Sequence, residues 1–183
     1  MKKVVAVIFL SSLLFVIGTS VQAQSKCKFN REGTDPITGI SYKSIGAYFY
    51  HRNIRTGVIT GNSEWIVNIV RSGDNYILSS QCDIEGFFED KMAIGNPLIL
   101  KLENNKIITL NAMQVLEPLR INVGGVNVVR YTSGYNIKIE DIELLSSAKV
   151  VFARITLGPR VRSENIKDKD AITLKKGVIC LIQ

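Results

Sequence analysis

The chain is poor in the residues on which most catalytic and metal sites depend. Of its 183 residues, one is histidine, three are cysteine and one is tryptophan. A single histidine, His51, excludes metal sites built from several histidines, and the cysteines lack the CxxC spacing that binds zinc. The motifs GxSxG, HExxH, the P-loop and a GxGxxG after a strand are also missing. The sequence therefore predicts no cofactor and no metal, and it favours a protein that is not an enzyme.

Long hydrophobic runs are missing too, except at the start of the chain. Two lysines after Met1 precede an apolar run from Val4 to Ile17, and the small residue Ala23 follows at a suitable cleavage position. The apolar run is shorter than the roughly 20 residues needed to span a membrane. This order predicts that residues 1–23 are a signal peptide that is removed on export.

The remaining residues, 24–183, are enough for a single domain with its own hydrophobic core. The residues just before Cys27 lack the small, apolar character of a lipoprotein signal. The predicted product is therefore a periplasmic or secreted, soluble protein that has no membrane span after cleavage and is not a lipoprotein.

Basic residues outnumber acidic ones by 23 to 16, and several of them gather late in the chain. Acidic residues interrupt this stretch and no aromatic residue lies among them, which argues against nucleic acid as a partner. An ordinary solvated surface explains the pattern; the alternative is a weak anion-binding patch. Its members would be Arg160, Arg162, Lys167 and Lys169.

Three cysteines in an exported chain allow one disulfide and leave one thiol over. The possible pairings are Cys27–Cys82, Cys27–Cys180 and Cys82–Cys180, and the sequence leaves all three open. We favour Cys27–Cys180, because it would tie the two ends of the mature chain together. Cys82 would then be a small buried hydrophobe or a free thiol.

The clearest structural signal is a β-hairpin from Leu98 to Leu110 that turns at Asn104-Asn105. A two-residue turn pairs Lys101 with Ile108 and Ile99 with Leu110. That register places charges near the turn and apolar residues on both faces of the far end. We expect a helix to cover this far end, because an isolated hairpin is marginal in water.

Short connections between the other apolar runs predict sequential antiparallel pairing. The stretch Asp83–Gly95 is irregular and is expected to be a loop or a short helix. The expected strands are 42–50, 58–60, 64–71, 76–81, 115–123, 126–135 and 149–157.

Helical spacing is confined to the C-terminal third of the chain. Ile139, Ile142 and Leu145 predict one helix. A second helix is favoured over 168–182, capped by Asp168 or Asp170, with an apolar stripe of Ala171, Leu174, Val178 and Leu181. Gly177 and the β-branched residues after it keep a strand open as the alternative. The predicted fold is α+β, a mostly antiparallel, meander-like sheet of hairpins with one or two helices packed on it.

Two patterns at the chain ends resemble small exported proteins of Bacteroidetes-type bacteria that have no assigned activity. The first is Cys27-Lys28-Phe29 followed by Asp35-Pro36-Ile37-Thr38-Gly39. The second is the order of strand end, helix and strand from Tyr135 to Leu157, before a terminal segment with Cys180. The resemblance leaves the middle of the chain uncovered. It implies an exported α+β domain with a terminal helix and a Cys27–Cys180 pair, and it supplies no catalytic residues.

These observations favour a non-enzymatic binding or structural domain whose partner is a protein, a glycan or an envelope component. The candidate interaction surface is aromatic and consists of Tyr48, Phe49, Tyr50, Phe87 and Phe88. One alternative is a carrier of small apolar ligands. Its cavity would exceed roughly 300 Å³ and would be lined by the Leu98–Leu110 hairpin and by the hairpin of strands 64–71 and 76–81. Another is a hydrolase with an unrecognised site, which would place His51, or two of Asp83, Glu85, Glu89 and Asp90, in a cleft. The sequence does not indicate the oligomeric state.

Overall fold

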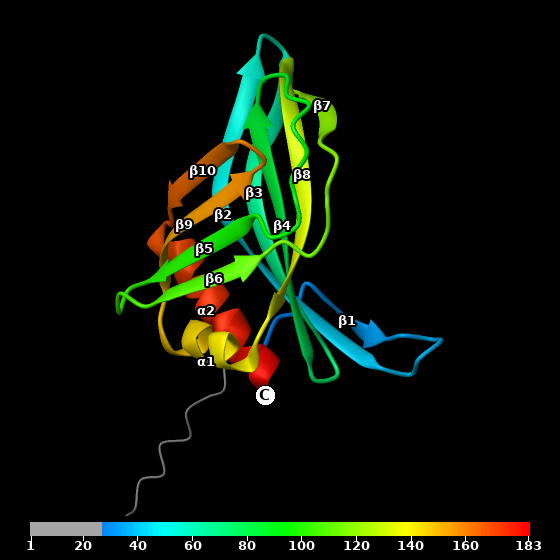
Figure 1. Cartoon of the computed structure of the whole chain (residues 1–183), viewed down its shortest axis with the longest axis vertical. Coiled ribbons are helices and arrows are strands. Elements are labelled where there is room, and N and C mark those ends of the chain that lie inside the picture. The colour runs from blue at the N-terminus through cyan, green and yellow to red at the C-terminus, as the bar shows by residue number, and fades with distance from the viewer. Residues whose placement is uncertain (1–26) are drawn as a thin grey trace, which may run out of the picture.

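The computed structural model describes residues 27–183, so the predicted signal peptide and its cleavage site lie outside the described residues. The described chain forms an α+β fold of two antiparallel sheets and two helices (Figure 1), as the sequence predicts. The larger sheet has six strands, in the spatial order β1 (Arg31–Thr34), β2 (Ser41–Thr56), β3 (Ile59–Ser72), β4 (Asn75–Glu85), β8 (Val126–Ile137) and β7 (Leu119–Val123).

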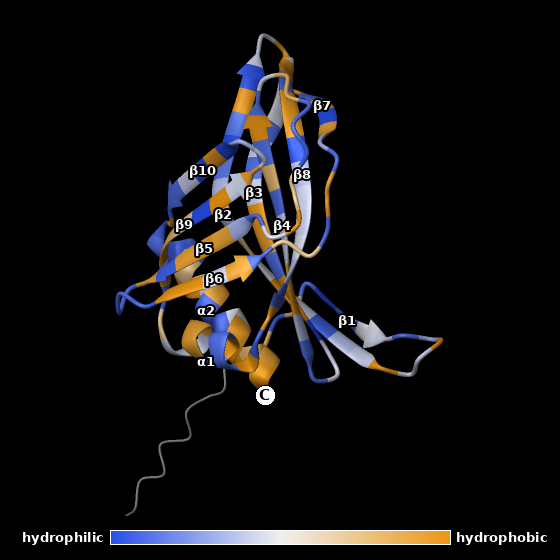
Figure 2. Ribbon diagram, in the orientation of Figure 1, coloured by the Kyte–Doolittle hydropathy of each residue, from blue (hydrophilic) through white to orange (hydrophobic). Residues whose placement is uncertain are grey.

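The smaller sheet lies across one face of the larger one (Figure 1). Its strands follow the order β10 (Arg160–Asn165), β9 (Val150–Leu157), β5 (Pro97–Leu102) and β6 (Ile107–Asn111). The helices are α1 (Ile139–Ser147) and α2 (Asp168–Ile182). Buried side chains from both sheets and both helices form one continuous core. Many of the residues in β5, β6 and α1 are hydrophobic (Figure 2).

The two sheets are joined along one side and open along the other. Just after β6, Ala112 bridges Tyr135 of β8, and the Met113 amide donates to the Gly134 carbonyl at 3.0 Å. On the opposite side β10 lies next to β2, but in residues 27–183 these two strands do not pair. We call this unpaired junction between β2 and β10 the seam.

The Leu98–Leu110 hairpin is confirmed, but its predicted register is wrong by one residue. Leu100 pairs with Ile108 and Lys101 with Ile107. The loop has three residues rather than two. Asn105 is the one residue in it with a positive φ, of 64°, and its backbone N–H donates to the Leu102 carbonyl at 3.0 Å. The corrected register gives a clean alternation, and the expected end with two apolar faces does not exist. Residues 98, 100, 102, 108 and 110 are buried, whereas 101, 107 and 109 are exposed.

Several predicted boundaries move for identifiable reasons. Asp83–Glu85 belongs to β4, and the rest of Asp83–Gly95 contains no helix. The strand expected over 115–123 begins only at Leu119, directly after Pro118, which has no N–H to donate. A bulge in β9 turns Val150 toward the core together with Ala153, although simple alternation places them on opposite faces.

The hydrophobic pattern of the sequence does not predict β1 or β10. Both are edge strands, and their residues are mostly polar. Such strands carry no apolar alternation, so the hydrophobic pattern gives them no signal.

The segment 168–182 is a helix, as favoured, and its buried stripe is the predicted one. Its N-cap is Lys167, so Asp168 and Asp170 lie in the first turn instead of capping it. There they are well placed to interact with the positive end of the helix dipole. Gly177 permits close packing on β2, since a Cβ at this position would lie 3.0 Å from the Cβ of Ile45.

Cys27 and Cys180 form a disulfide with their Cα atoms 5.7 Å apart, which confirms the favoured pairing. The bond fastens the start of the described chain to the last turns of α2. Cys82 is the remaining cysteine, and it is fully buried. Within residues 27–183, neither helix is long and apolar enough to cross a membrane.

Candidate functional site

The larger sheet divides beside the seam. β3 and β4 pair from Ser72↔Asn75 as far as Trp65↔Cys82 and then separate. Beyond that point β3 continues with β2, while β4 continues with β8. Side chains satisfy backbone groups at this fork: the Asp83 carboxylate accepts the Glu64 amide at 3.2 Å, and Arg162 of β10 donates to the Asp83 carbonyl.

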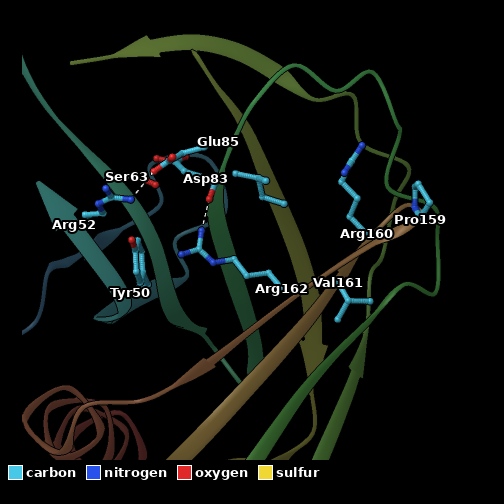
Figure 3. A pocket seen from close by; sticks show the side chains of 10 residues that line it. Tyr50, Arg52, Ser63, Asp83, Glu85, Pro159, Arg160, Val161 and Arg162 are labelled. Atoms are coloured by element: carbon cyan, nitrogen blue, oxygen red, sulfur yellow. Dashed lines mark hydrogen bonds and ion pairs between the residues drawn. The ribbon is translucent and has the colours of Figure 1, made fainter. Parts of the chain in front are cut away.

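A cleft of about 620 Å³ opens where the fork meets the seam (Figure 3). Its volume is in the range typical of ligand-binding pockets. Three strands of the larger sheet line one side, and the β9–β10 turn with the start of β10 lines the other. The lining residues are Tyr50, Arg52, Ser63, Asp83, Ile84, Glu85, Pro159, Arg160, Val161 and Arg162.

Arg162 forms a fixed part of the cleft wall. Its guanidinium lies 4.3 Å from the centroid of the Tyr50 ring and donates to Glu164 at 3.0 and 3.1 Å. With the additional bond to the Asp83 carbonyl, this side chain links β10 to β2 and β4. Only 14 % of the side chain is exposed, so Arg162 holds the cleft wall in place and offers few free donors to a ligand.

Two other arginines present most of their donors to solvent. Arg52 pairs with Glu85 at 3.1 Å and is 60 % exposed. Arg160 lies 3.5 Å from the Phe88 ring centroid and 3.4 Å from Asp90, and it is 42 % exposed. A guanidinium has five N–H donors, so each of these contacts leaves several unused. Figure 3 shows Arg52 and Arg160 on opposite sides of the cleft.

The carboxylates of the cleft are already paired. Asp83 is fully buried, and Arg130 binds both of its oxygens. Glu85 pairs with Arg52 on the same side of the cleft. Each arginine at the cleft has one carboxylate partner: Arg52 has Glu85, Arg130 has Asp83, Arg160 has Asp90 and Arg162 has Glu164. The charges therefore balance, and what the cleft offers to an anion is the unused donors of its exposed arginines.

The predicted aromatic surface is not a single patch. Phe49 is buried against Trp65, with ring centroids 5.4 Å apart, so its assignment to an exposed surface is wrong. The burial follows from simple alternation, because Ile45 and Ala47 lie on the same face of β2 and are buried too, and the β-bulge between Tyr48 and Tyr50 shifts the register only beyond this point. Tyr50 lies in the cleft, whereas Tyr48 is exposed beside His51.

The other two aromatic candidates lie in the segment after β4. Phe88 is half-buried beneath Arg160, and Phe87 is exposed. The five predicted residues are thus distributed over the core, the cleft and separate parts of the surface.

The predicted anion patch is also divided. Arg160 and Arg162 both line the cleft. Lys167 and Lys169 lie at the start of α2 and do not contribute to it. The structure thus brings the two arginines of the patch together in the cleft and places both lysines elsewhere.

The residues considered for hydrolysis are only partly brought together. His51 contacts Glu64 at 3.2 Å and Asn53 at 3.0 Å, and it does not line the cleft. Asp83 and Glu85 both line it, as the hydrolase alternative requires of two carboxylates. Glu89 and Asp90 are not lining residues of this cleft; they pair with Arg120 and Arg160, respectively.

Two further possibilities concern metals and apolar ligands. Within residues 27–183, no group of three potential metal-ligating residues is arranged around a common point. The cleft is not the cavity that the carrier alternative predicts, because no residue of the Leu98–Leu110 hairpin lines it.

Sequence reasoning missed Arg52, Ser63 and Arg130. Arg130 had one usable signal, since it is a charged residue inside the apolar run of β8 and therefore needs a partner. Arg52 and Ser63 had none, because they reach the cleft only where β3 and β4 separate.

No protein-family model, curated protein or solved structure matches this chain.

Proposed function

We propose that this protein is an exported, non-enzymatic binding domain and that its ligand-binding site is the cleft at the seam. The ligand carries carboxylate groups and belongs to a protein, a glycan or another component of the cell envelope. Export is supported by the signal-peptide pattern of residues 1–23 and by the Cys27–Cys180 disulfide, since disulfides persist in oxidising compartments.

The observation that carries this proposal is the pair of exposed guanidinium groups, Arg52 and Arg160, on opposite sides of one cleft. Guanidinium forks match carboxylates in shape and bind them through two parallel hydrogen bonds. The ion pairs with Glu85 and Asp90 are exposed to solvent, and such pairs contribute little to stability. A ligand carboxylate can therefore replace them at small cost.

The state of the cleft carboxylates favours binding over hydrolysis. The Arg130 guanidinium donates a hydrogen bond to each oxygen of Asp83, and the backbone N–H of Glu64 donates a second one to Oδ2. A general acid or base has to come within hydrogen-bond reach of the group whose proton it transfers. Asp83 is fully buried and each of its oxygens accepts a hydrogen bond, so Glu85 is the one accessible carboxylate among the lining residues, whereas the hydrolase alternative requires two.

Citrate is a suitable probe because it presents several carboxylates on a small molecule that has no peptide backbone and no sugar ring. We expect saturable chemical-shift changes at residues of the cleft when citrate is titrated into ¹⁵N-labelled protein at low salt. Arg52→Met and Arg160→Met should each weaken binding by at least about fivefold, since a hydrogen bond to a charged group contributes about 1.5–3 kcal/mol.

The matched control is Lys169→Met, which removes one positive charge from the surface outside the cleft. If Lys169→Met weakens citrate binding as much as the arginine variants do, the protein attracts anions only through its net charge. The same conclusion follows if citrate produces no saturable change, and either result contradicts the proposed site.

A further inference from the structure

Two open strand edges border the cleft. In residues 27–183, β10 pairs only with β9, and β2 beyond Ser44 pairs only with β3. Each strand therefore has a side along which backbone donors and acceptors lack a strand partner. Tyr50 and Arg52 belong to one of these strands, and Arg160 to Arg162 belong to the other.

The turn before β10 determines which of its backbone groups face the open side. Gly158 and Pro159 form a two-residue loop, with a φ of 63° at Gly158, and Leu157 pairs with Arg160 across it. In an antiparallel ladder, backbone groups point alternately toward the partner strand and away from it. The pair that closes a two-residue loop faces inward, so the N–H and C=O of Val161 and Ser163 face the open side.

The loop is held in place by its surroundings. A Cβ on Gly158 would lie 2.8 Å from the Lys91 carbonyl oxygen, so the backbone approaches the segment after β4 closely. Arg160, directly after the loop, packs on the Phe88 ring of the same segment. The first half of the β10 edge is therefore preorganised, and preorganisation lowers the entropic cost of binding.

We propose that the cleft receives an extended acidic peptide, which adds a strand to the free edge of β10 and places its carboxylates against Arg52 and Arg160. This proposal rests on the proposed function, because it uses the same cleft as the ligand site. Strand addition obtains affinity from main-chain hydrogen bonds and specificity from alternate side chains. The edge supplies the former, and the arginines supply a preference for glutamate and aspartate.

An acidic peptide fits these features better than an acidic glycan does. A uronic acid chain would satisfy the arginines, but it has no regular ladder of donors and acceptors to match the edge of β10. Val161, at the centre of this edge within the cleft, is 59 % exposed, and it adds an apolar surface suited to a side chain of an adjoining strand.

The test uses the protein spanning residues 24–183 and a short blocked peptide of alternating glutamate and valine. Binding is measured by calorimetry and by ¹⁵N chemical shifts. Two further peptides of the same sequence carry N-methyl groups on alternate backbone nitrogens. One is methylated on the odd-numbered residues and the other on the even-numbered residues. We expect methylation in one register to weaken binding at least about tenfold, because it removes edge hydrogen bonds.

The matched variants are Val161→Pro and Val161→Ala. Proline at an edge position removes an outward-facing N–H and leaves the β9 ladder intact. Val161→Pro should weaken peptide binding about tenfold, whereas Val161→Ala should retain most of the peptide affinity. The methylated peptides use the wild-type protein, so they decide the question even if Val161→Pro does not fold.

The possible failures are distinguishable. If neither methylation register matters, or if a uronate oligosaccharide binds as tightly as the peptide, strand addition is wrong while the carboxylate site stands. If citrate and the peptide both fail to bind, the proposed function itself is wrong. If the peptide binds and Arg52→Met with Arg160→Met leaves its affinity unchanged, the peptide uses another surface and the proposal is overturned.

Discussion

Arg130 binds both carboxylate oxygens of Asp83, from Nε to Oδ1 at 2.7 Å and from Nη2 to Oδ2 at 2.9 Å. The two residues are direct cross-strand partners on β8 and β4. Asp83 is completely buried, whereas a quarter of the Arg130 side chain is exposed. The pair stands beside the fork in the larger sheet, where the Asp83 carboxylate also accepts the Glu64 amide in place of a backbone carbonyl.

We predict that Arg130→Met destabilises the protein by about 3 kcal/mol, because it leaves a buried carboxylate without its counter-charge. Asp83→Leu should cost a similar amount, because it leaves Arg130 and the Glu64 amide without an acceptor. The double variant should be more stable than the sum of the two losses implies, since it removes both charges together. Urea unfolding of all four proteins gives the coupling energy, and additive losses would contradict the role of the pair.

The cysteine prediction follows from burial. Burial of the Cys82 side chain, which excludes water from the thiolate, raises the pKa of this thiol to about 12. Titration with a disulfide reagent near pH 8 should therefore find no reactive thiol in the native protein and one after denaturation. Cys82→Ala should remove that one. Three thiols in the denatured, unreduced protein would show that Cys27 and Cys180 are not paired.

The sequence predicts the helices and strands better than it predicts the register in which the strands pair. Strands and helices with an apolar stripe, such as α2 with Leu174 and Val178, were predictable because burial imposes a period on them. The register of the Leu98–Leu110 hairpin was not, because it depends on which asparagine takes a positive φ. The polar edge strands β1 and β10 leave no period to detect.

The cleft was predictable only in fragments. The sequence places Arg160 and Arg162 in a candidate anion patch and Tyr50 in a candidate aromatic surface, and it offers Asp83 and Glu85 among the carboxylates of the hydrolase alternative. What joins them is the separation of β3 from β4 after Trp65 and Cys82, together with a seam between strands that are distant in sequence. Both are tertiary features, and neither a local propensity nor a residue spacing encodes them.

The turn of the Leu98–Leu110 hairpin gives a prediction about Asn105. Left-handed backbone costs most non-glycine residues about 1–2 kcal/mol, less for asparagine and nothing for glycine. Asn105→Gly should therefore keep the stability or raise it slightly, whereas Asn105→Val should lower it by about 1–2 kcal/mol. Asn104→Gly is the control. It should destabilise, because Asn104 has no positive φ and its side chain accepts the Lys106 amide at 3.1 Å.

A pH-dependent contact joins the same turn to the end of α1. The backbone amide of Lys149 donates to the Glu103 carboxylate at 2.9 Å and lowers the pKa of Glu103, and the Lys149 ammonium at 3.5 Å acts in the same direction. Because the pKa in the folded state is the lower one, the contact stabilises the fold fully above the ordinary pKa near 4.5. This contribution is lost as the pH falls through the lowered value.

An NMR titration of the Glu103 carboxyl carbon should accordingly give a midpoint below 4.5. Lys149→Met should move it only part of the way back, since the backbone amide is the larger cause and survives the substitution. Between about pH 6 and about pH 3, the wild type should lose more stability than Glu103→Gln, which has no proton to bind at this site. Equal losses in the two proteins, or a midpoint at the ordinary value, would mean that the amide of Lys149 does not hold this carboxylate in solution.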